Sequence, residues 1–322
     1  MASQFSLLQT RRFLPMFLTQ FLGALNDNVF KQALILLFTY QAASLSSLSP
    51  SVLNNLSAVL FILPYFLFSA TAGQIADKYE KSQLTRLIKL FEIGIMALAT
   101  IGFLLHHFVL LFVALFLMGT HSAFFGPIKY AILPQLLQED ELVGGNALFE
   151  MGTSLAILIG MIIGGVVMVE SGDNLLGISL LVLSIAGLGY LSSRQVPARS
   201  VGNANLRVDW NIFRTSTQAL RYLKGLPSVF WTVLGISWFW YYGATFLTQI
   251  PQFTKQTLHG SEPVVTFLLT VFSVGIGLGS LMCERLAGHR VNLKLVPIGA
   301  IGLCLFAIDL YFSVHQLQPA SH

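Results

Sequence analysis

The sequence predicts an all-α fold, a bundle of helices that crosses a membrane many times. Of its 322 residues, 55% are hydrophobic and only 10% are charged, with a mean hydropathy of +0.73. A typical soluble protein is about 25% charged. Apolar runs of about 20 residues, the length that a membrane helix needs, recur along the whole chain. This composition indicates a polytopic membrane protein and argues against a soluble one.

Nine apolar runs are long enough to cross a bilayer as helices. We predict that the first six form an N-terminal bundle within residues 1–193, and that three more form a partial C-terminal bundle within 226–322. The predicted spans are residues 13–40, 54–76, 84–105, 108–133, 143–169, 174–193, 226–250, 263–283 and 293–314.

The basic residues set the expected orientation. With a cytoplasmic N-terminus, 16 of the 18 Lys and Arg residues fall in cytoplasmic segments, as the positive-inside rule requires. Lys31 would then lie within the membrane, and only Lys255 outside. This placement accounts for the formal charge of +4, so we expect no nucleic-acid partner. The cytoplasmic set is Arg11, Arg12, Lys78, Lys81, Arg86, Lys89, Lys129, Arg194, Arg199, Arg207, Arg214, Arg221, Lys224, Arg285, Arg290 and Lys294.

Residues 194–225 interrupt the apolar rhythm with a basic segment that contains Gly, Asn and Pro. We interpret this segment as a cytoplasmic linker between the two bundles. Four apolar residues recur in it at helical spacing, opposite basic ones, which is typical of an amphipathic helix on a membrane surface. An unstructured basic connector is an equally good interpretation. The apolar residues are Trp210, Phe213, Leu220 and Leu223, and the basic ones are Arg214, Arg221 and Lys224.

The first predicted span contains an acid and a base within an apolar run. A charge at the centre of a membrane helix costs roughly 2.5–3.5 kcal/mol on insertion scales, so Asp27 should face a polar cavity or a partner. At about 100° per residue, Gln20, Asp27 and Lys31 share one face, with Asn28 at its edge. Asp27 and Lys31 can neutralise each other one turn apart. The additional amides instead favour a site for a polar headgroup.

A short charged pattern follows the second span and recurs in weaker form after the eighth. The first copy contains Gly73, Asp77, Lys78 and Lys81, and resembles the loop signature of the major facilitator superfamily, with Glu80 in place of the usual glycine. The second copy is Ser280 to Arg285, with Glu284 as its acid. The resemblance implies two six-helix halves and a conformational latch at Gly73, Asp77, Lys78, Lys81, Glu284 and Arg285. A complete transporter of this type would have three more spans than this sequence provides.

Further stretches resemble the bacterial lysophospholipid transporter (LplT) family, in the version fused to an acyltransferase and an acyl-carrier-protein synthetase. These stretches are 21–31, 125–134, 145–150, 243–251 and 273–286. The resemblance implies flipping of lysophospholipids, chiefly lysophosphatidylethanolamine, from the outer to the inner leaflet of the bacterial inner membrane for re-acylation. It also implies an acyltransferase and acyl-ACP synthetase, fused or separate, as partners.

The candidate substrate-binding residues fit a zwitterionic headgroup. Asp27 is expected to bind its ammonium and Lys129 its phosphate, since a lysine is a point charge for phosphate. Lys129 is equally well interpreted as a positive-inside anchor, and Glu150 as a local pairing partner. The full candidate set is Gln20, Asp27, Asn28, Lys31, Lys129, Tyr130 and Glu150.

No catalytic residue, metal site or cofactor is predicted. The glycines at 160–165 and 275–279 lie in apolar runs without a preceding strand, so we expect close helix packing there and not a phosphate loop. Cys283 and Cys304 are expected to be small core residues. His121 is interpreted as a hydrogen-bonded core histidine or a proton carrier, and Glu92 has no assigned role.

Two other functions fit the sequence less well. One is a transporter of the same fold that exports drugs or small solutes in exchange for protons. The other is a membrane scaffold for a cytoplasmic acyltransferase, which would have no need of a charge such as Asp27 within a span.

Overall fold

The computed structural model describes residues 4–40, 48–171, 174–198, 202–203, 205–260, 262–288 and 292–316. All of the regular structure in these ranges is helical. A 3-10 helix, η1, precedes ten α-helices. The bounds are η1 Gln4–Gln9, α1 Leu14–Tyr40, α3 Pro50–Lys78, α4 Lys81–Leu104, α5 Phe108–Leu136, α6 Leu142–Ser171, α7 Leu176–Ser193, α8 Ile212–Lys224, α9 Pro227–Gln256, α10 Glu262–Ala287 and α11 Leu295–Gln316.

The nine long helices match the nine predicted spans to within six residues at each end. Seven of the described helices are long and apolar enough to cross a membrane. The other two, α1 and α9, contain 27 and 30 residues. Their polar and aromatic side chains lower their hydropathy. The all-helical membrane fold is therefore confirmed, and the exact number of spans stays a prediction.

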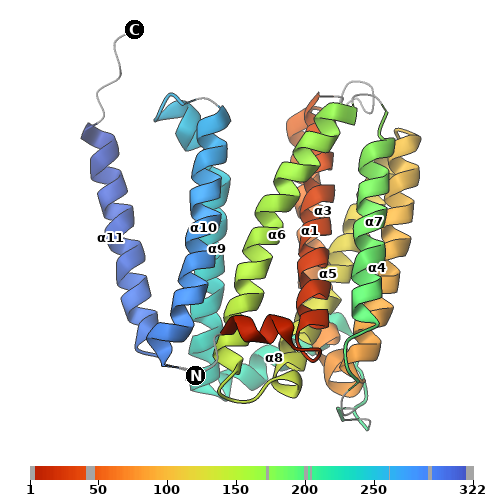
Figure 1. The fold of residues 1–322 in the computed structure, drawn as a ribbon, viewed down its shortest axis with the longest axis vertical. Helices are drawn as coiled ribbons and strands as arrows, with labels where there is room; N and C mark the ends of the chain where they lie inside the picture. The colour runs from red at the N-terminus through yellow and green to blue at the C-terminus, as the bar shows by residue number, and fades with distance from the viewer. Residues whose placement is uncertain are drawn as a thin grey trace.

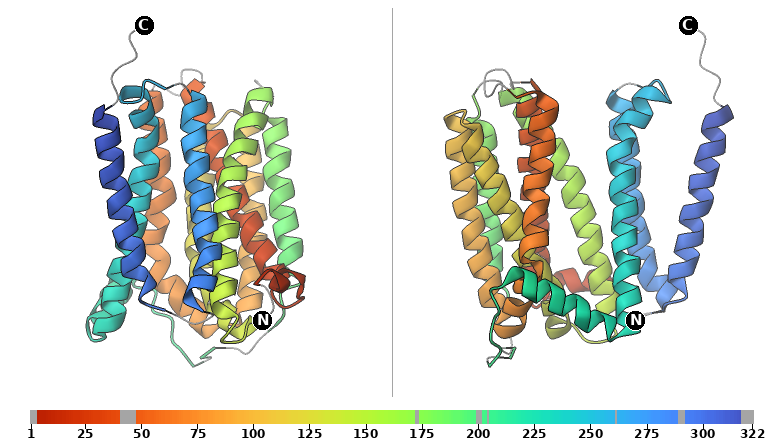
Figure 2. Two further views of the ribbon diagram at one scale, coloured as in Figure 1. Left: turned by 60° about the vertical axis from the view of Figure 1, so that its left-hand side comes forward. Right: turned by 180° about the vertical axis from the view of Figure 1, so that it is seen from behind.

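Six helices, α1 and α3 to α7, form one closely packed group, and α9 to α11 stand to one side of it (Figures 1 and 2). Within the group, α1 packs against α6 and α7, α3 against α5, and α4 against α5 and α7. The second group contacts the first through α10, which packs along α6. The apolar interior contains edge-to-face aromatic pairs such as Phe30 and Phe103, whose ring centroids lie 5.9 Å apart.

Glycines allow the closest helix crossings, as predicted for Gly160 and Gly164. A Cβ atom on either residue would lie 2.8 Å from a carbonyl oxygen of α1, at Leu25 and Val29 respectively. A Cβ on Gly119 of α5 would lie 2.3 Å from the carbonyl oxygen of Phe61 on α3. The small residues therefore let backbones approach each other directly.

The same prediction is wrong for the glycines of α10. A Cβ on Gly275 or Gly279 would meet open space, and one on Gly277 would make an ordinary contact of 3.8 Å with Met151. Cys283 and Cys304 were expected in the core, but both are exposed. The reason is that α10 and α11 bury little surface against the rest of the described chain.

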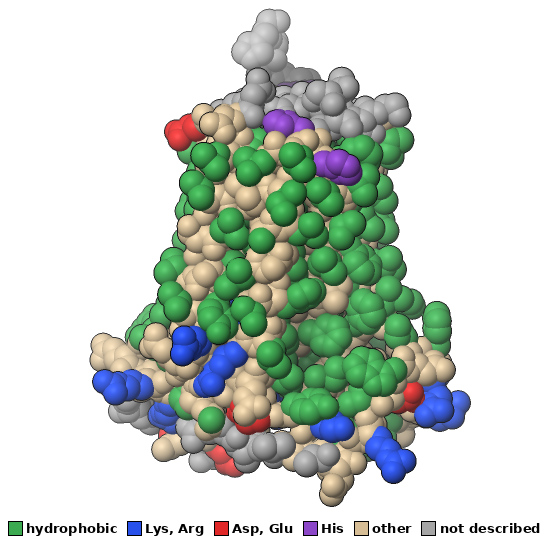
Figure 3. All heavy atoms as spheres, turned by 90° about the vertical axis from the view of Figure 1, so that its right-hand side faces the viewer, with side chains coloured by type: hydrophobic (Ala, Val, Ile, Leu, Met, Phe, Trp, Pro, Cys, Tyr) green, Lys and Arg blue, Asp and Glu red, His purple; other side chains and the backbone are tan. Residues whose placement is uncertain are grey.

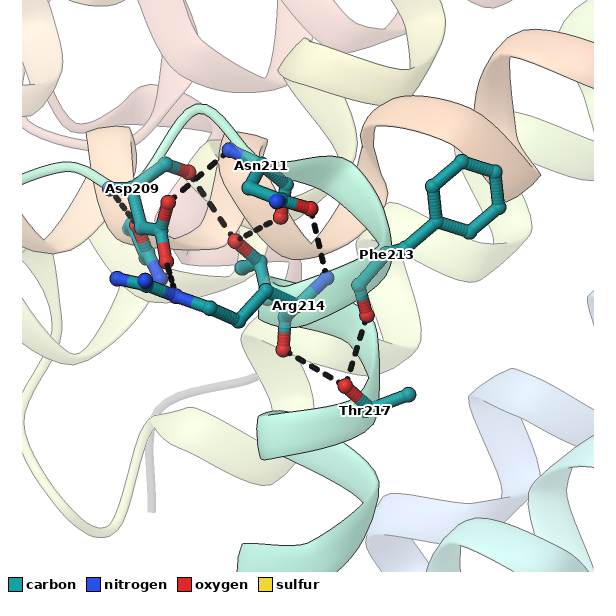
Figure 4. Close-up of polar contacts among 7 residues, drawn as sticks. Asp209, Asn211, Phe213, Arg214 and Thr217 are labelled. Atoms are coloured by element: carbon teal, nitrogen blue, oxygen red, sulfur yellow. Dashed lines mark hydrogen bonds and ion pairs between the residues drawn. The ribbon is translucent and has the colours of Figure 1, made fainter.

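The linker contains the helix that was one of its two interpretations. Asn211 caps α8 by accepting a hydrogen bond from the Arg214 amide at 3.0 Å, and Arg214 Nε donates to Asp209 at 2.6 Å (Figure 4). Hydrogen bonds from the Asn211 amide and from Arg214 lower the pKa of Asp209. Phe213 points away from this polar network in Figure 4 and is 73% exposed. Trp210 lies just before the helix.

The linker is anchored on the end of α3. The Asn203 amide donates to the Asp77 carbonyl oxygen at 2.9 Å, and the Asp209 amide donates to Gln74 Oε1 at 2.8 Å. A Cβ on Gly202 would lie only 1.8 Å from the Asp77 carbonyl oxygen, so this turn requires a residue without a side chain. α8 then runs across this end of the bundle from α3 to α9 (Figure 2).

On the face that Figure 3 shows, charged side chains are concentrated at the α8 end of the bundle, below a broad hydrophobic belt. This matches the predicted asymmetry of Lys and Arg, with two corrections, while Arg199 and Arg290 lie outside the described residues. Lys89 was counted among the cytoplasmic residues, but its side chain is 0% exposed inside the six-helix group. Lys129 is also half-buried within α5 and not in a connecting loop.

Candidate functional site

Asp27 faces α5 and not the lipid. Its Oδ2 atom accepts a hydrogen bond of 2.9 Å from the Ser122 hydroxyl. Tyr65 of α3 contacts Ser122 and lies beside Asp27. Within the described part of the chain, the other carboxylate oxygen, Oδ1, is buried and has no hydrogen-bond partner. A buried acceptor without a partner is unusual in native proteins, so this oxygen marks a position where a donor is missing.

Lys31 lies one turn beyond Asp27 on α1 but is not paired with it. Its ammonium lies over the Phe61 ring of α3, 4.5 Å from the ring centroid. Such a cation–π contact is worth roughly 0.5–2 kcal/mol, depending on desolvation. No ion pair joins Asp27 to Lys31 in the described structure, so the two charges do not simply neutralise each other along the helix.

Three further candidates form one cluster between α5 and α6. The Tyr130 hydroxyl donates to Glu150 Oε1 at 2.6 Å. The Lys129 ammonium lies 4.8 Å from the centroid of the Tyr130 ring and within electrostatic range of both Glu150 and Asp27. Glu150 thus makes the local pairing contacts that were one interpretation of it. Its hydrogen bond with Tyr130 fixes the tyrosine ring beside the Lys129 ammonium.

The Asp27 site and this cluster are aligned along α5. Ser122 and Lys129 are seven residues apart, which is almost two full turns and about 10 Å of rise. Both side chains therefore project from the same face of α5. An acid held by Ser122 and a base at Lys129 are thus arranged along one line of the helix bundle.

Gln20 and Asn28 do not join Asp27. Gln20 donates to Thr153 of α6 at 2.9 Å. Asn28 donates back to the Ala24 carbonyl at 2.7 Å and packs beside Gly160. The two amides belong to the contact between α1 and α6, because α1 is enclosed by other helices on more than one side.

A buried ionic cluster lies next to the site, and the sequence analysis did not identify it. Lys89 Nζ and Glu92 Oε2 are 2.6 Å apart, with side chains 0% and 1% exposed. Asn26 donates to the other Glu92 oxygen at 2.7 Å, and His121 Nε2 lies 3.2 Å from Oε2. The cluster therefore joins α1, α4 and α5 inside the apolar core.

The sequence contained a signal for this cluster. Lys89 and Glu92 are three residues apart within an apolar run, which is the spacing of an intrahelical ion pair. Gly23 provides space for it, since a Cβ there would lie 2.3 Å from Lys89 Nζ. The His121 ring stacks on Phe125, and its Nδ1 lies 3.5 Å from Ser122 Oγ. His121 thus lies between Glu92 and the serine that holds Asp27.

The proposed latch residues lie where α3 ends and α4 begins. Asp77 and Lys78 form the last turn of α3, and Asp77 is exposed. Glu80, which replaces the usual glycine of the signature, caps α4 by accepting hydrogen bonds from the Ser82 and Gln83 amides. Lys81 is buried in the first turn of α4. Glu80 therefore caps α4 with its side chain, which the glycine of the signature could not do.

Two features of the latch differ from expectation. A Cβ on Gly73 would meet nothing within 4 Å, so no close helix approach occurs there among the described residues. Glu284 and Arg285 lie within α10, which ends at Ala287, and not in a loop. Arg285 is exposed.

Other parts of the described chain contain apolar grooves and no cluster of metal-binding residues. No group of three His, Cys, Asp or Glu residues is arranged there to hold a metal ion. One apolar groove, of about 270 Å³, lies between α1 and α7. Another, of about 370 Å³, lies between α9, α10 and α11 and includes Asp309.

The helical architecture and the polar site inside it are those of a membrane transporter, and comparison with known proteins identifies the class. Residues 16–321 match the family model of the Major Facilitator Superfamily, and the chain belongs to this family. The chain is therefore a transporter and not an enzyme.

Among curated proteins, the chain is similar to the lysophospholipid transporter LplT of three bacteria. It is 27% identical to that of Escherichia fergusonii and 26% identical to that of Enterobacter sp. strain 638, in both cases over 94% of this chain and 72% of the relative. It is 28% identical to the protein of Photorhabdus laumondii over 91% of this chain and 71% of the relative.

Among solved structures, the chain resembles the human organic anion transporter MFSD10 (TETRAN). The TM-score is 0.68 with 14% identity, and the match covers 85% of this chain and 72% of the human protein. At this identity the match supports the fold alone.

Proposed function

We propose that this protein moves lysophospholipids, of the lysophosphatidylethanolamine kind, from the outer to the inner leaflet of the bacterial inner membrane. The similarity to proteins named lysophospholipid transporter LplT, over more than nine-tenths of the chain, supports this substrate class. The concentration of surface Lys and Arg at the α8 end supports a cytoplasmic location of that end and of the N-terminus.

The observation that carries the proposal is the pair of opposite charges within one helix group. Asp27 has one buried oxygen without a partner, and its other oxygen is held by Ser122. Lys129 lies about two turns along α5 from Ser122. A zwitterionic headgroup provides an ammonium for the first residue and a phosphate for the second. In the described conformation Oδ1 is covered, so ligand entry requires movement of the side chains around Asp27.

The other candidate residues support this binding mode in two ways. Tyr130 and Glu150 hold Lys129 in place and can offer hydrogen bonds to a glycerol hydroxyl. Gln20 and Asn28 set the position of α1 on α6, and through it the position of Asp27. In our proposal these residues orient the headgroup or the helices that hold it.

Re-acylation is the reaction that would consume the transported lipid. A lysophospholipid delivered to the inner leaflet has a free hydroxyl that an acyltransferase can esterify. We therefore propose a cytoplasmic acyltransferase with an acyl-ACP synthetase, fused or separate, as the functional partner.

Uptake of labelled lysophosphatidylethanolamine into proteoliposomes tests the function. We expect Asp27→Asn to reduce apparent affinity about tenfold to a hundredfold, which corresponds to the 1.5–3 kcal/mol of a hydrogen bond to a charged group. Lys129→Ala should reduce uptake of every lysophospholipid, because all contain phosphate. Asp140→Asn, in the exposed connection before α6, is the matched control and should have no effect. Absence of uptake by the wild-type protein would refute the proposal.

A proton-coupled exporter is the second candidate. The observation in its favour is the chain of contacts from Glu92 through His121 and Ser122 to Asp27, since a buried imidazole between two carboxylates can carry a proton. Proton flux that depends on a small solute, in liposomes without lysolipid, would favour this candidate.

A further inference from the structure

Asp27 has an open position for a cation in the described conformation. One of its oxygens is satisfied by Ser122 and the other has no partner. An uncompensated carboxylate inside a protein is strongly unfavourable. An amine-bearing headgroup can provide the missing positive charge, whereas a headgroup without an amine cannot.

The chain has its own cation within reach. Lys31 is four residues after Asp27 on the same helix, the spacing at which an acid and a base can pair. Its side chain has four methylene groups and a compact ammonium. That ammonium now lies 4.5 Å from the centroid of the Phe61 ring. The Phe61 ring is thus the resting position of the ammonium in the described conformation, and the open oxygen of Asp27 is a second position within its reach.

We infer that Lys31 is a tethered counter-cation for Asp27 and decides which headgroups the transporter accepts. When the ligand has an amine, that amine binds Asp27 and the Lys31 ammonium stays over Phe61. When the ligand has none, Lys31 turns from Phe61 to Asp27 and provides the charge itself. The inference rests on the proposed lysophospholipid transport and adds the range of substrates to it.

A structural anchor would be placed differently. Lysine residues that only anchor a helix extend to the membrane surface, whereas Lys31 lies well inside α1 and is half-buried against α3. The charged group within electrostatic range of Lys31 among the described residues is Asp27, on its own helix. Asp27 is therefore its natural partner.

The test measures uptake of two lysophospholipids that share one acyl chain, lysophosphatidylethanolamine and lysophosphatidylglycerol, into proteoliposomes. Lys31→Met should reduce uptake of the amine-free lipid about tenfold or more relative to uptake of the amine-bearing lipid. Phe61→Leu removes the resting position and should act in the opposite direction, because the released ammonium then competes with the ligand amine. Lys31→Arg should restore uptake of the amine-free lipid.

Lys224→Met, at the exposed end of α8, is the matched loss of a lysine and should leave the ratio of the two lipids unchanged. Equal loss of both lipids in Lys31→Met, with Lys31→Arg equally impaired, would overturn the inference and leave the proposed function intact. An unchanged ratio in both Lys31→Met and Phe61→Leu would overturn it as well. Failure of the proposed function has a different result, namely no uptake of either lipid by the wild-type protein.

Discussion

Lys89 and Glu92 form an ion pair of 2.6 Å on α4, with side chains that are almost completely excluded from the surface. Asn26 of α1 and His121 of α5 also contact the Glu92 carboxylate. The pair thus connects three helices of the six-helix group at a point that neither water nor lipid reaches. Because these contacts satisfy both charges, loss of either partner leaves the other unpaired in the core.

We predict that Lys89→Met destabilises the protein by about 3–5 kcal/mol, the range for removing one member of a buried ion pair. The double variant Lys89→Met, Glu92→Gln should be more stable than Lys89→Met alone, because it leaves no unpaired charge. Thermal unfolding in detergent, followed by circular dichroism, measures both effects. A double variant whose losses are simply additive would show that the pair does not act as a unit.

A second prediction concerns the crossing of α1 and α6. Gly160→Ala should destabilise the protein by about 1–3 kcal/mol, as overpacking does, because the new Cβ would lie 2.8 Å from the Leu25 carbonyl oxygen. Gly165→Ala on the same helix is the matched control, since its Cβ would meet nothing within 4 Å. The same unfolding experiment compares the two. Equal destabilisation would mean that loss of glycine itself, and not the crossing, is responsible.

A third prediction separates the latch from the binding site. Asp77→Asn should slow the alternation between inward-open and outward-open states and leave substrate affinity within a few-fold, because a contact made in one state shifts populations without touching the ligand. The linker contact should survive, since it uses the Asp77 carbonyl oxygen and not the carboxylate. Spectroscopic distance measurements between the two bundles, together with binding measurements, check this. A large loss of binding at an unchanged rate of alternation would contradict the prediction.

A fourth prediction concerns pH. Glu141, in the connection between α5 and α6, forms an ion pair with Arg12. Partial burial raises its pKa, but hydrogen bonds from the Gln138 amide and from Arg12, together with the Arg12 charge, outweigh this and lower the pKa below the ordinary value of 4.5. A lowered folded-state pKa means that the stabilisation is complete above about pH 4.5 and is lost as the pH falls through the folded value.

Both side chains of this pair are partly exposed, so the contribution should not exceed about 1 kcal/mol. Glu141→Gln should therefore lower the unfolding temperature slightly at pH 7, and its difference from the wild type should shrink as the pH falls below 4.5. Unfolding midpoints measured at pH 7 and at a series of lower pH values check this. A difference between the proteins that does not shrink at low pH would assign the effect of Glu141 to packing and not to its charge.

The sequence by itself determined the helices and the most unusual residue among them. Helix positions follow from the lengths of the apolar runs, since a bilayer sets the number of residues that a span needs. Asp27 stands out because a charge within such a run is rare. The amphipathic pattern after residue 210 likewise left the helix of the linker as one of two interpretations, and α8 is that helix.

Only the tertiary structure decided which side chains meet. Gln20, Asp27 and Lys31 share one face in projection, but Gln20 contacts α6, Asp27 contacts α5 and Lys31 contacts α3. A helical projection cannot separate these partners, because a face that is one stripe in sequence borders several helices in the bundle. Lys89 appeared to be a surface charge for the same reason, since its position near the start of a span did not reveal that Glu92, Asn26 and His121 surround it.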